Sequence, residues 1–167
     1  QDFDSRNFHR KDLRKGFSLE LVLAFDECTG GDVILDNLDQ NSRGFRLFVN
    51  REETLELMLS DAQNRNHWAL QRGILRGGEK YHIVINVDGG PRIVSAVVNG
   101  RFMDGAEDRQ FGWGRFSPHL RDITGSGMLR GDPSFTGNIC YLRLYSRYLL
   151  TNEACLRYNH LKETDCM

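Results

Sequence analysis

The sequence has almost no net charge and no long hydrophobic run. Its 167 residues include 22 Lys and Arg against 23 Asp and Glu, which gives a formal net charge of −1. A chain without a bulk electrostatic field gives no support to nucleic acid or an anionic membrane as a partner. No run of about 18 apolar residues is present, so the sequence predicts no membrane-spanning helix.

The start of the sequence lacks an initiator methionine and the apolar core of a signal peptide. We therefore expect a mature form or an excised module of a longer protein. Residues 1–15, QDFDSRNFHRKDLRK, are interpreted as a lead-in with one short edge strand. Asp2, Asp4 and Asp12 dilute the basic residues of this segment, which disfavours a nucleic-acid-binding arm.

The four cysteines lack the CxxC spacing of a zinc site or a thioredoxin-like redox motif. They are Cys28, Cys140, Cys155 and Cys166. An even number permits two disulfides, and four unpaired thiols are an equal alternative. A clip between Cys155 and Cys166 is conceivable, but the spacing alone does not define the connectivity.

What the sequence does contain is a series of short strand patterns separated by glycine-rich turns. Seventeen glycines and 10% aromatic residues favour strands and turns over a helical bundle. The clearest segment is YHIVINVDGGPRIVSAVVNG, in which two β-branched runs flank Gly89 and Gly90. A Gly-Gly step accepts positive φ at both central positions of a tight turn, so the segment predicts a long β-hairpin.

A two-residue turn at Gly89 and Gly90 fixes the register of this hairpin. The expected cross-strand pairs on its apolar face are Ile85–Val94, Ile83–Ala96 and Tyr81–Val98. The opposite face is mixed and carries His82. Such a pair of faces is typical of a sheet with one side in a core.

Further strands are predicted wherever apolar residues alternate with polar ones. They are expected at residues 16–26, 32–36, 44–50, 54–60, 101–103, 128–131 and 136–146. In the last of these, Cys140, Leu142 and Leu144 are expected on one side, opposite Ile139 and its neighbours. Residues 103–127 form a long loop without a clear period.

One short helix is expected at residues 152–158, after the last strand. Thr151 is a good N-cap, and Glu153 then lies in the first turn, where the helix dipole favours an acidic side chain. About ten short strands and one terminal helix predict a single all-β domain over residues 1–167. Its architecture is a two-sheet antiparallel β-sandwich.

Several motifs follow one another in a specific order. GFSLELVLAF precedes a glycine-turned strand pair, then YHIVINVDGG, then a return strand that ends in Asn99 and Gly100. The chain closes with G-N-I, LRLYSR and TNEA, a last core strand, a turn and a short helix. Over residues 16–160 this order resembles the laminin-G-like, concanavalin A-like jelly-roll domains. DGGP followed by RQFGWGRF resembles modules attached to secreted bacterial carbohydrate-active enzymes.

The resemblance implies a jelly roll with a curved, concave sheet, and glycan or protein binding more often than catalysis. Retaining glucanases of this fold hold two carboxylates about 5 Å apart, in strings such as E-x-D-x-x-E. No such string occurs here, and Glu20 has Val22 and Ala24 as neighbours on its strand face. The nucleophile motif G-x-S-x-G is also absent. We therefore expect no enzyme activity.

Sugars present apolar C–H faces that stack on aromatic rings and hydroxyls that pair with Asp, Asn, Arg and His. The candidate ligand-binding residues are Trp68, His67, Arg109, Trp113, Asp104 and His82. Each has a structural alternative. Trp68 is then a partly buried strand residue, the loop aromatics hold the long loop on the sandwich, and His82 is simply hydrogen-bonded rather than lining a concave groove.

Calcium requires clustered oxygen ligands, and many jelly rolls of this kind carry one structural calcium ion. Asp26, Asp32, Asp88 and Asp104 lie near expected turns. Because no EF-hand-like spacing is present, none of the four is assigned as a ligand.

The sequence thus predicts a non-catalytic carbohydrate-binding or accessory module of a larger secreted, cell-surface or periplasmic protein. Its expected partner is a polysaccharide, a glycan or a neighbouring domain. The alternatives are a protein-interaction or spacer domain and a glycoside hydrolase with an unrecognised site. Exposure of Trp68 or Trp113 in a groove favours binding, and two carboxylates about 5–10 Å apart in that groove favour catalysis.

Overall fold

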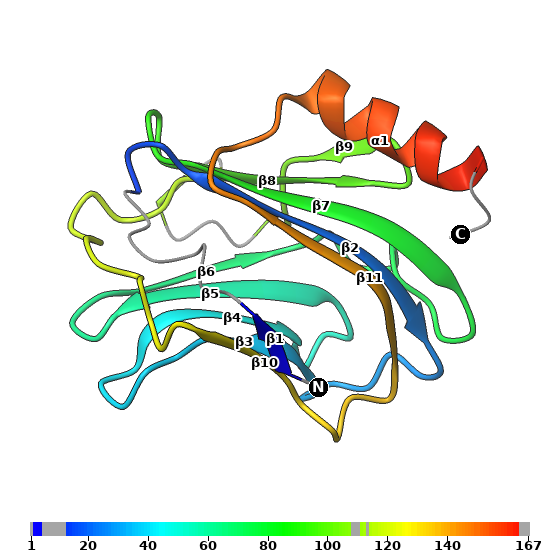
Figure 1. Ribbon diagram of the computed structural model, residues 1–167, viewed down its shortest axis with the longest axis horizontal. Coiled ribbons are helices and arrows are strands. Elements are labelled where there is room, and N and C mark those ends of the chain that lie inside the picture. The colour runs from blue at the N-terminus through cyan, green and yellow to red at the C-terminus, as the bar shows by residue number, and fades with distance from the viewer. Residues whose placement is uncertain (1, 5–12, 108–110, 113, 164–167) are drawn as a thin grey trace.

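The protein consists of two antiparallel β-sheets packed face to face, with one helix outside them (Figure 1). This computed structural model describes residues 2–4, 13–107, 111–112 and 114–163, without the side chains of residues 2–4. The predicted two-sheet antiparallel sandwich with a C-terminal helix is confirmed. The lead-in contributes one short edge strand, also as predicted.

Among the described residues, one sheet has six strands and the other has five. The six-stranded sheet has the order β1 (Asp2–Asp4), β10 (Met128–Gly131), β3 (Val33–Asp36), β4 (Arg43–Val49), β5 (Leu55–Asp61) and β6 (Arg65–Ala69). The five-stranded sheet has the order β11 (Gly137–Tyr145), β2 (Phe17–Phe25), β7 (Lys80–Asp88), β8 (Ile93–Val98) and β9 (Arg101–Met103). The helix is α1 (Thr151–Glu163).

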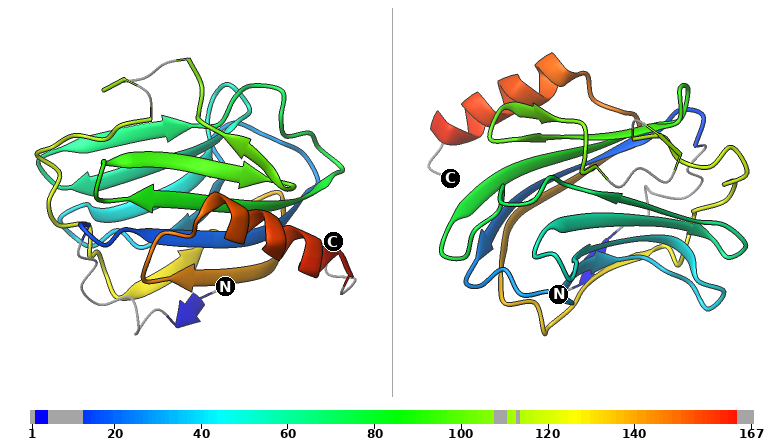
Figure 2. Two further views of the ribbon diagram at one scale, coloured as in Figure 1. Left: turned by 90° about the horizontal axis from the view of Figure 1, so that it is seen from above. Right: turned by 180° about the vertical axis from the view of Figure 1, so that it is seen from behind.

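The hydrophobic core lies between the sheets and is built from alternate residues of each strand. Successive side chains of a strand point to opposite faces. The inward residues of β2 and β5 are fully buried: Phe17, Leu19, Leu21, Leu23, Phe25, Leu55, Leu57 and Leu59. The outward residues Ser18, Glu20 and Val22 of β2 are buried as well. Figure 2 shows why, because α1 crosses the outer face of the five-stranded sheet.

The loop of the β7–β8 hairpin is longer than predicted, so the two-residue turn at Gly89 and Gly90 is wrong. The observed cross-strand pairs are Asp88–Ile93, Val87–Val94, Ile85–Ala96 and Ile83–Val98. The loop therefore comprises residues 89–92, and the register differs from the prediction by two residues. A shift of two preserves which side chains face the core, because the side-chain period is also two.

Positive φ in this loop occurs at Arg92, with φ of 60°, and not at Gly89 or Gly90. Gly89 is needed for a different reason. A Cβ atom at Gly89 would overlap the backbone carbonyl oxygen of Leu13, whereas one at Gly90 would meet nothing closer than Asp88 Oδ1 at 3.4 Å. The hairpin loop thus packs directly against the end of the lead-in.

We expect Gly89→Ala to lower the free energy of unfolding by about 1–3 kcal/mol, the usual cost of overpacking. Gly90→Ala is the matched control and should change it by less than about 0.5 kcal/mol. Urea unfolding of both variants measures the difference. Equal, small effects at the two glycines would show that the lead-in does not pack against this loop.

Strand β11 contains a bulge that reverses part of the predicted side-chain pattern. Its register against β2 shifts between Ile139 and Tyr141. As a result Ile139 packs against the core together with Leu142 and Leu144, while Cys140 is exposed. The predicted placement of Cys140 on the same side as Leu142 and Leu144 is therefore wrong, because an extra residue in one strand changes the face of the residues before it.

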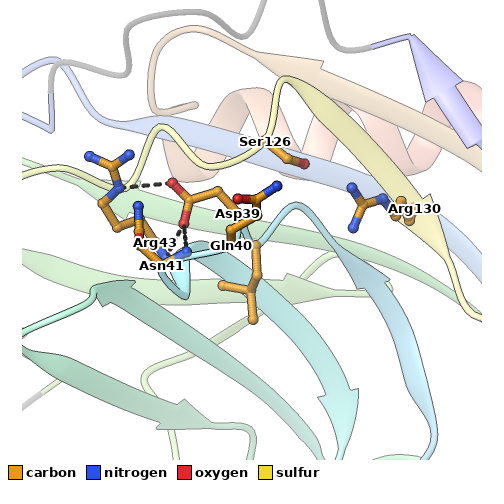
Figure 3. A pocket seen from close by; sticks show the side chains of 7 residues that line it. Asp39, Gln40, Asn41, Arg43, Ser126 and Arg130 are labelled. Atoms are coloured by element: carbon orange, nitrogen blue, oxygen red, sulfur yellow. Dashed lines mark hydrogen bonds and ion pairs between the residues drawn. The ribbon is translucent and has the colours of Figure 1, made fainter.

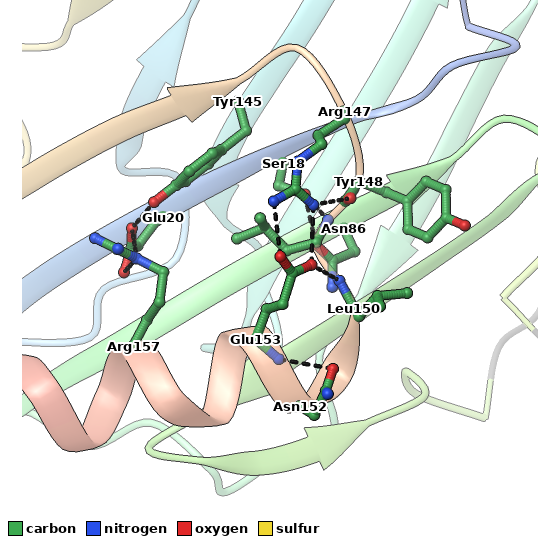
Figure 4. Close-up of polar contacts among 11 residues, drawn as sticks. Ser18, Glu20, Asn86, Tyr145, Arg147, Tyr148, Leu150, Asn152, Glu153 and Arg157 are labelled. Carbon is green, nitrogen blue, oxygen red and sulfur yellow. Dashed lines mark hydrogen bonds and ion pairs between the residues drawn. The ribbon is translucent and has the colours of Figure 1, made fainter.

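Helix α1 is longer than the predicted 152–158, and Thr151 is not its N-cap. The first helical bond runs from the Ala154 N–H to the Leu150 carbonyl at 3.0 Å, which places Leu150 at the N-cap. Glu153 Oε2 accepts a hydrogen bond from the Leu150 N–H at 2.8 Å (Figure 4), one half of a capping box. Within the described residues, no helix is long and apolar enough to span a membrane.

The described cysteines are free thiols. Cys28 and Cys155 are partly buried and Cys140 is exposed, while Cys166 lies outside the described residues. The Cys155 Sγ donates a hydrogen bond to the Gly100 carbonyl at 3.2 Å. The conceivable clip between Cys155 and Cys166 is thus contradicted at Cys155.

Candidate functional site

The structure describes four of the six candidate ligand-binding residues. Arg109 and Trp113 lie outside the described residues. Asp104 follows β9 and is partly buried, and its Oδ1 accepts a hydrogen bond from Gln71 Nε2 at 3.2 Å. Trp68 and His82 are buried, and His67 is exposed. The four described candidates therefore do not form one common site.

Trp68 belongs to the core rather than to a groove. It points inward from β6 and is only 7% exposed. Gly105 lies against its indole ring, since a Cβ there would come 2.6 Å from Trp68 Nε1. The hollow beside it has a volume of about 10 Å³, too small for a sugar. The structure therefore supports the structural alternative for Trp68, in which it is a mostly buried strand residue.

His82 lies on the outer face of the five-stranded sheet, where α1 covers it, so it does not line a concave groove. Its Nε2 is 3.0 Å from Glu20 Oε1, and both side chains are fully buried. The imidazole stacks on the Tyr158 ring of α1, with ring centroids 5.9 Å apart. The structural alternative for His82 therefore applies here as well.

Glu20 is the centre of a buried polar cluster that joins α1 to the sheet. Tyr145 donates to Glu20 Oε2 at 2.6 Å, and Arg157 Nε lies 2.7 Å from both carboxylate oxygens (Figure 4). Burial alone raises the pKa of Glu20, but the hydrogen bonds from His82, Arg157 and Tyr145 outweigh it and lower that pKa to about 2. A fully buried, ionised carboxylate that accepts hydrogen bonds from three residues is an anchor, not a site open to a substrate.

The long loop of residues 103–127 is held on the sandwich by one of its aromatic residues. Phe116 is 4% exposed, and its N–H donates to the Arg92 carbonyl at 2.9 Å. The Gly114 carbonyl accepts from the Val94 N–H at 2.8 Å. Phe111, by contrast, is 41% exposed. Packing thus accounts for Phe116, and Phe111 remains at the surface.

His67 is the candidate residue that the structure places in an open groove. This groove, called here the His67 groove, has a volume of about 570 Å³ on the outer face of the six-stranded sheet. Its lining includes Phe48, Asn50, Glu56, His67, Ala69 and Ala106. A groove of this size falls in the range of ligand-binding clefts.

The polar groups of the His67 groove are connected by hydrogen bonds. His67 Nδ1 lies 2.6 Å from Glu56 Oε1, and Asn50 Nδ2 donates to Glu56 Oε2 at 2.8 Å. Burial alone would raise the pKa of Glu56. The hydrogen bonds from His67 and Asn50 lower that pKa by more than burial raises it, so the pKa lies below its usual range. Glu56 therefore carries a charge at neutral pH and accepts hydrogen bonds.

The alternation of two neighbouring strands explains this arrangement. Glu56 on β5 points outward between Leu55 and Leu57, and His67 on β6 points outward because Trp68 points inward. Ala69 pairs with Glu56, and His67 pairs with the next outward residue of β5. Diagonal neighbours on one sheet face lie within reach of long side chains. The alternation of residues 54–60 is the sequence signal that places Glu56 on the face opposite Leu55 and Leu57.

A second hollow of about 550 Å³ lies at the end of the same sheet (Figure 3). We call it the loop pocket. It is lined by Leu38, Asp39, Gln40, Asn41, Arg43, Ser126 and Arg130. None of these residues was singled out from the sequence, because segments far apart in the chain build it: the β3–β4 loop, the start of β4, the loop before β10, and β10 itself.

One cross-strand row of side chains links the two hollows on the outer face. The register aligns Arg130, Asp36, Arg46, Met58 and His67 on β10, β3, β4, β5 and β6. Their inward neighbours on each strand, such as Leu35, Leu47 and Leu57, are buried. With neighbouring strands about 4.8 Å apart, the row from β10 to β6 is roughly 19 Å long.

The four carboxylates considered for calcium do not gather in one place. Across the described part of the chain, no group of three His, Cys, Asp or Glu side chains is placed to hold a metal ion. Asp32 accepts hydrogen bonds from Thr136, and Asp88 accepts one from the Gly90 N–H at 3.0 Å. Calcium binding therefore stays a prediction without an acidic ligand cluster among the described residues.

Comparison with solved structures shows similar folds at low sequence identity. The CBM40 of the Ruminococcus gnavus IT-sialidase, bound to alpha2,3 sialyllactose, is 14% identical, with a TM-score of 0.64 over 89% of this chain and 84% of that one. The binding domain of botulinum neurotoxin DC in complex with rat synaptotagmin II is 13% identical, with a TM-score of 0.66 over 90% of this chain.

A third similar structure is that of botulinum neurotoxin type C, whose cell entry is dependent upon interaction with two ganglioside molecules. It is 11% identical, with a TM-score of 0.58 over 90% of this chain. The chain spans only 36–38% of the neurotoxin domains it matches. No curated protein matches the sequence significantly.

The family of the chain is shown by its sequence as a whole. The Laminin_G_3 family model matches residues 3–155, which is most of the chain and includes both sheets and the first residues of α1. This match agrees with the predicted resemblance and with the observed sandwich. The chain belongs to the Laminin_G_3 family of the concanavalin A-like lectin/glucanases superfamily.

Proposed function

We propose that this chain is a non-catalytic carbohydrate-binding module and that its glycan lies in the His67 groove. The observation that carries the proposal is the composition of the groove. The partly buried Phe48 ring lies beside Asn50, Glu56 and His67, which are linked by hydrogen bonds. A sugar offers a C–H face for the ring and hydroxyls for the carboxylate and the imidazole.

The comparisons support this proposal without deciding it. The similar CBM40 structure is bound to sialyllactose, and cell entry of botulinum neurotoxin type C, which contains a similar sandwich, depends on interaction with ganglioside molecules. The same fold also carries unrelated functions, so the proposed glycan binding is based on the groove and not on the fold. As a binding module for extracellular polymers, the chain would be part of a larger protein that is secreted, displayed on the cell surface or periplasmic.

Catalysis is the alternative that the groove itself raises, because Glu52 and Glu56 both line it. A glycoside hydrolase needs one carboxyl group with a raised pKa to protonate the leaving group. The pKa of Glu56 is lowered instead, and Glu52 is ion-paired with Arg72, whose Nε lies 2.8 Å from Glu52 Oε2. The groove therefore favours binding over hydrolysis.

A spacer or docking role has its own observation. Phe102 on β9 and Leu150 and Leu156 at α1 are 52%, 52% and 66% exposed. They lie on the side of the molecule opposite the His67 groove. A neighbouring domain that packs there is compatible with glycan binding on the other sheet, so the two roles do not compete for one surface.

We expect His67→Ala to weaken glycan binding about tenfold or more, because a hydrogen bond to a charged network is lost at the ligand. Its melting temperature should stay nearly unchanged, since the imidazole is exposed and a surface ion pair contributes at most about 1 kcal/mol. A glycan array with the full chain identifies the ligand, and calorimetric titration compares the variants. His160→Ala on α1 is the matched control and should bind normally.

Two results would count against the proposal. Equal affinity of His67→Ala and His160→Ala for the array-identified glycan would remove the His67 groove as the binding surface. Release of shorter sugars from that glycan, abolished by Glu56→Gln with the fold intact, would identify a hydrolase instead.

A further inference from the structure

The loop pocket contains a guanidinium group that lacks a partner of its own. Arg130 is exposed on β10, and no hydrogen bond or ion pair of its side chain is found among the described residues. One cross-strand neighbour of Arg130 is Asp36, whose Oδ2 is occupied by Arg46 Nη2 at 2.9 Å. The other is Asp2 on β1, whose side chain lies outside the described residues. Within the described part of the chain, the positive charge of Arg130 is thus free to act on a ligand.

The other charges of the loop pocket compensate one another. Arg43 Nε is paired with Asp39 Oδ2 at 2.8 Å, and Asp39 Oδ1 accepts the backbone N–H groups of Asn41 and Arg43, each at 2.9 Å (Figure 3). Figure 3 places Arg130 on the opposite side of the hollow from this pair. Arg43 Nη1 also lies 3.4 Å from Asp122 Oδ2, outside the lining. Among the lining residues themselves, Asp39 and Arg43 offset each other, and the remaining charge is that of Arg130.

Two amide side chains add hydrogen-bond donors to this charge. The side chains of Gln40 and Asn41 are exposed, line the pocket and have no hydrogen-bond partner within the described part of the chain. Ser126 Oγ donates to the Met128 carbonyl at 3.0 Å, so its oxygen is left to accept. Guanidinium and amide N–H groups around one hollow match the oxygens of a carboxylate or a sulfate, and a guanidinium binds such groups with two parallel hydrogen bonds.

From this geometry we infer that the loop pocket is a subsite for an anionic substituent of a glycan, a sugar carboxylate or a sulfate ester, held by Arg130. The inference rests on the proposed function, because it assumes that the His67 groove on the same face binds the uncharged sugar units of the glycan. The row from Arg130 to His67 spans roughly 19 Å across the strands. An acidic oligosaccharide lying across this face has its charged substituent at β10 and its neutral units at β6.

The test compares glycans that differ only in the charged group. Calorimetric titration of the full chain uses sialyllactose against lactose, oligogalacturonate against its methyl ester, and a sulfated galactan oligosaccharide against its desulfated form. The wild-type chain is expected to bind the acidic member of at least one pair about tenfold or more tighter than its neutral partner. That preference should fall as salt is added, because the Arg130 guanidinium is exposed. The first two pairs report on a carboxylate, and the third on a sulfate.

Arg130→Gln should remove the preference for the acidic member and leave the affinity for the neutral member unchanged. Arg101→Gln changes the net charge equally on the exposed edge strand of the other sheet, and it should keep the preference. Equal binding of acidic and neutral members by the wild-type chain would overturn the anionic subsite and leave the proposed function standing. Binding of none of the six glycans would overturn both. Equal loss of neutral and acidic binding in Arg130→Gln, with an unchanged melting temperature, would show that Arg130 does not select for charge.

Discussion

Replacing Glu20 with alanine is expected to lower the free energy of unfolding by about 3–5 kcal/mol, because removing one partner of a buried ion pair leaves the other uncompensated. Glu20 is fully buried and holds Arg157, Tyr145 and His82 at 2.6–3.0 Å. Without its carboxylate, these donors lose their shared acceptor between α1 and the sheet. Urea unfolding at neutral pH measures the loss.

The same cluster makes stability depend on pH in a defined direction. The pKa of Glu20 is lowered to about 2 in the folded chain, whereas an ordinary Glu titrates near pH 4.3. A group with a depressed folded pKa contributes its stability above the unfolded pKa and loses it as the pH falls through the folded pKa. The stabilisation by Glu20 is therefore expected to disappear between about pH 4.3 and pH 2.

Glu20→Gln separates this effect from the loss of side-chain volume. The difference in unfolding free energy between wild type and Glu20→Gln should be largest at neutral pH and shrink steadily below about pH 4.3. Glu27→Gln, at an exposed position, is the matched control and should follow the wild-type profile. A Glu20→Gln profile parallel to wild type down to pH 2 would show that the carboxylate does not anchor α1.

Replacing Ile85 with alanine has the second large expected effect, a loss of about 2–5 kcal/mol in unfolding free energy. Ile85 lies at the centre of β7, is fully buried and pairs with Ala96. Truncation of the Ile85 side chain leaves a cavity in the core between the two sheets. Ile93→Ala, at the partly exposed end of the hairpin, should cost clearly less. A loss below about 1 kcal/mol at Ile85 would contradict its place in the core.

The fold could be predicted because most of it follows from local alternation. The patterns in β2 and β5 place their leucines on the core face without any knowledge of their partners. Where the prediction was wrong, a long-range contact decided the geometry. Gly89 packs on Leu13, and the bulge at Cys140 adapts β11 to β2. The error at the helix start has a local cause instead, because the carboxylate of Glu153 replaces Thr151 as the capping group.

The site was less predictable than the fold, because its residues come together only through strand pairing. Glu20 forms hydrogen bonds with Tyr145 and Arg157, which lie near the other end of the chain. His67 was a candidate for its position beside Trp68, yet its partner Glu56 became visible only when β5 and β6 were aligned. Aromatic residues were the strongest sequence signal for sugar binding, and Trp68 shows that an aromatic ring can serve the core instead.

In the proposed function, a glycan binds the outer face of the six-stranded sheet, in the His67 groove. A backbone-amide NMR titration of the full chain with a glycan selected on the array tests it most directly. The shift changes are expected to concentrate on β4, β5 and β6 around Glu56 and His67, while the shifts of α1 stay unchanged. Shift changes confined to α1 and β9, on the opposite side of the sandwich, would contradict it.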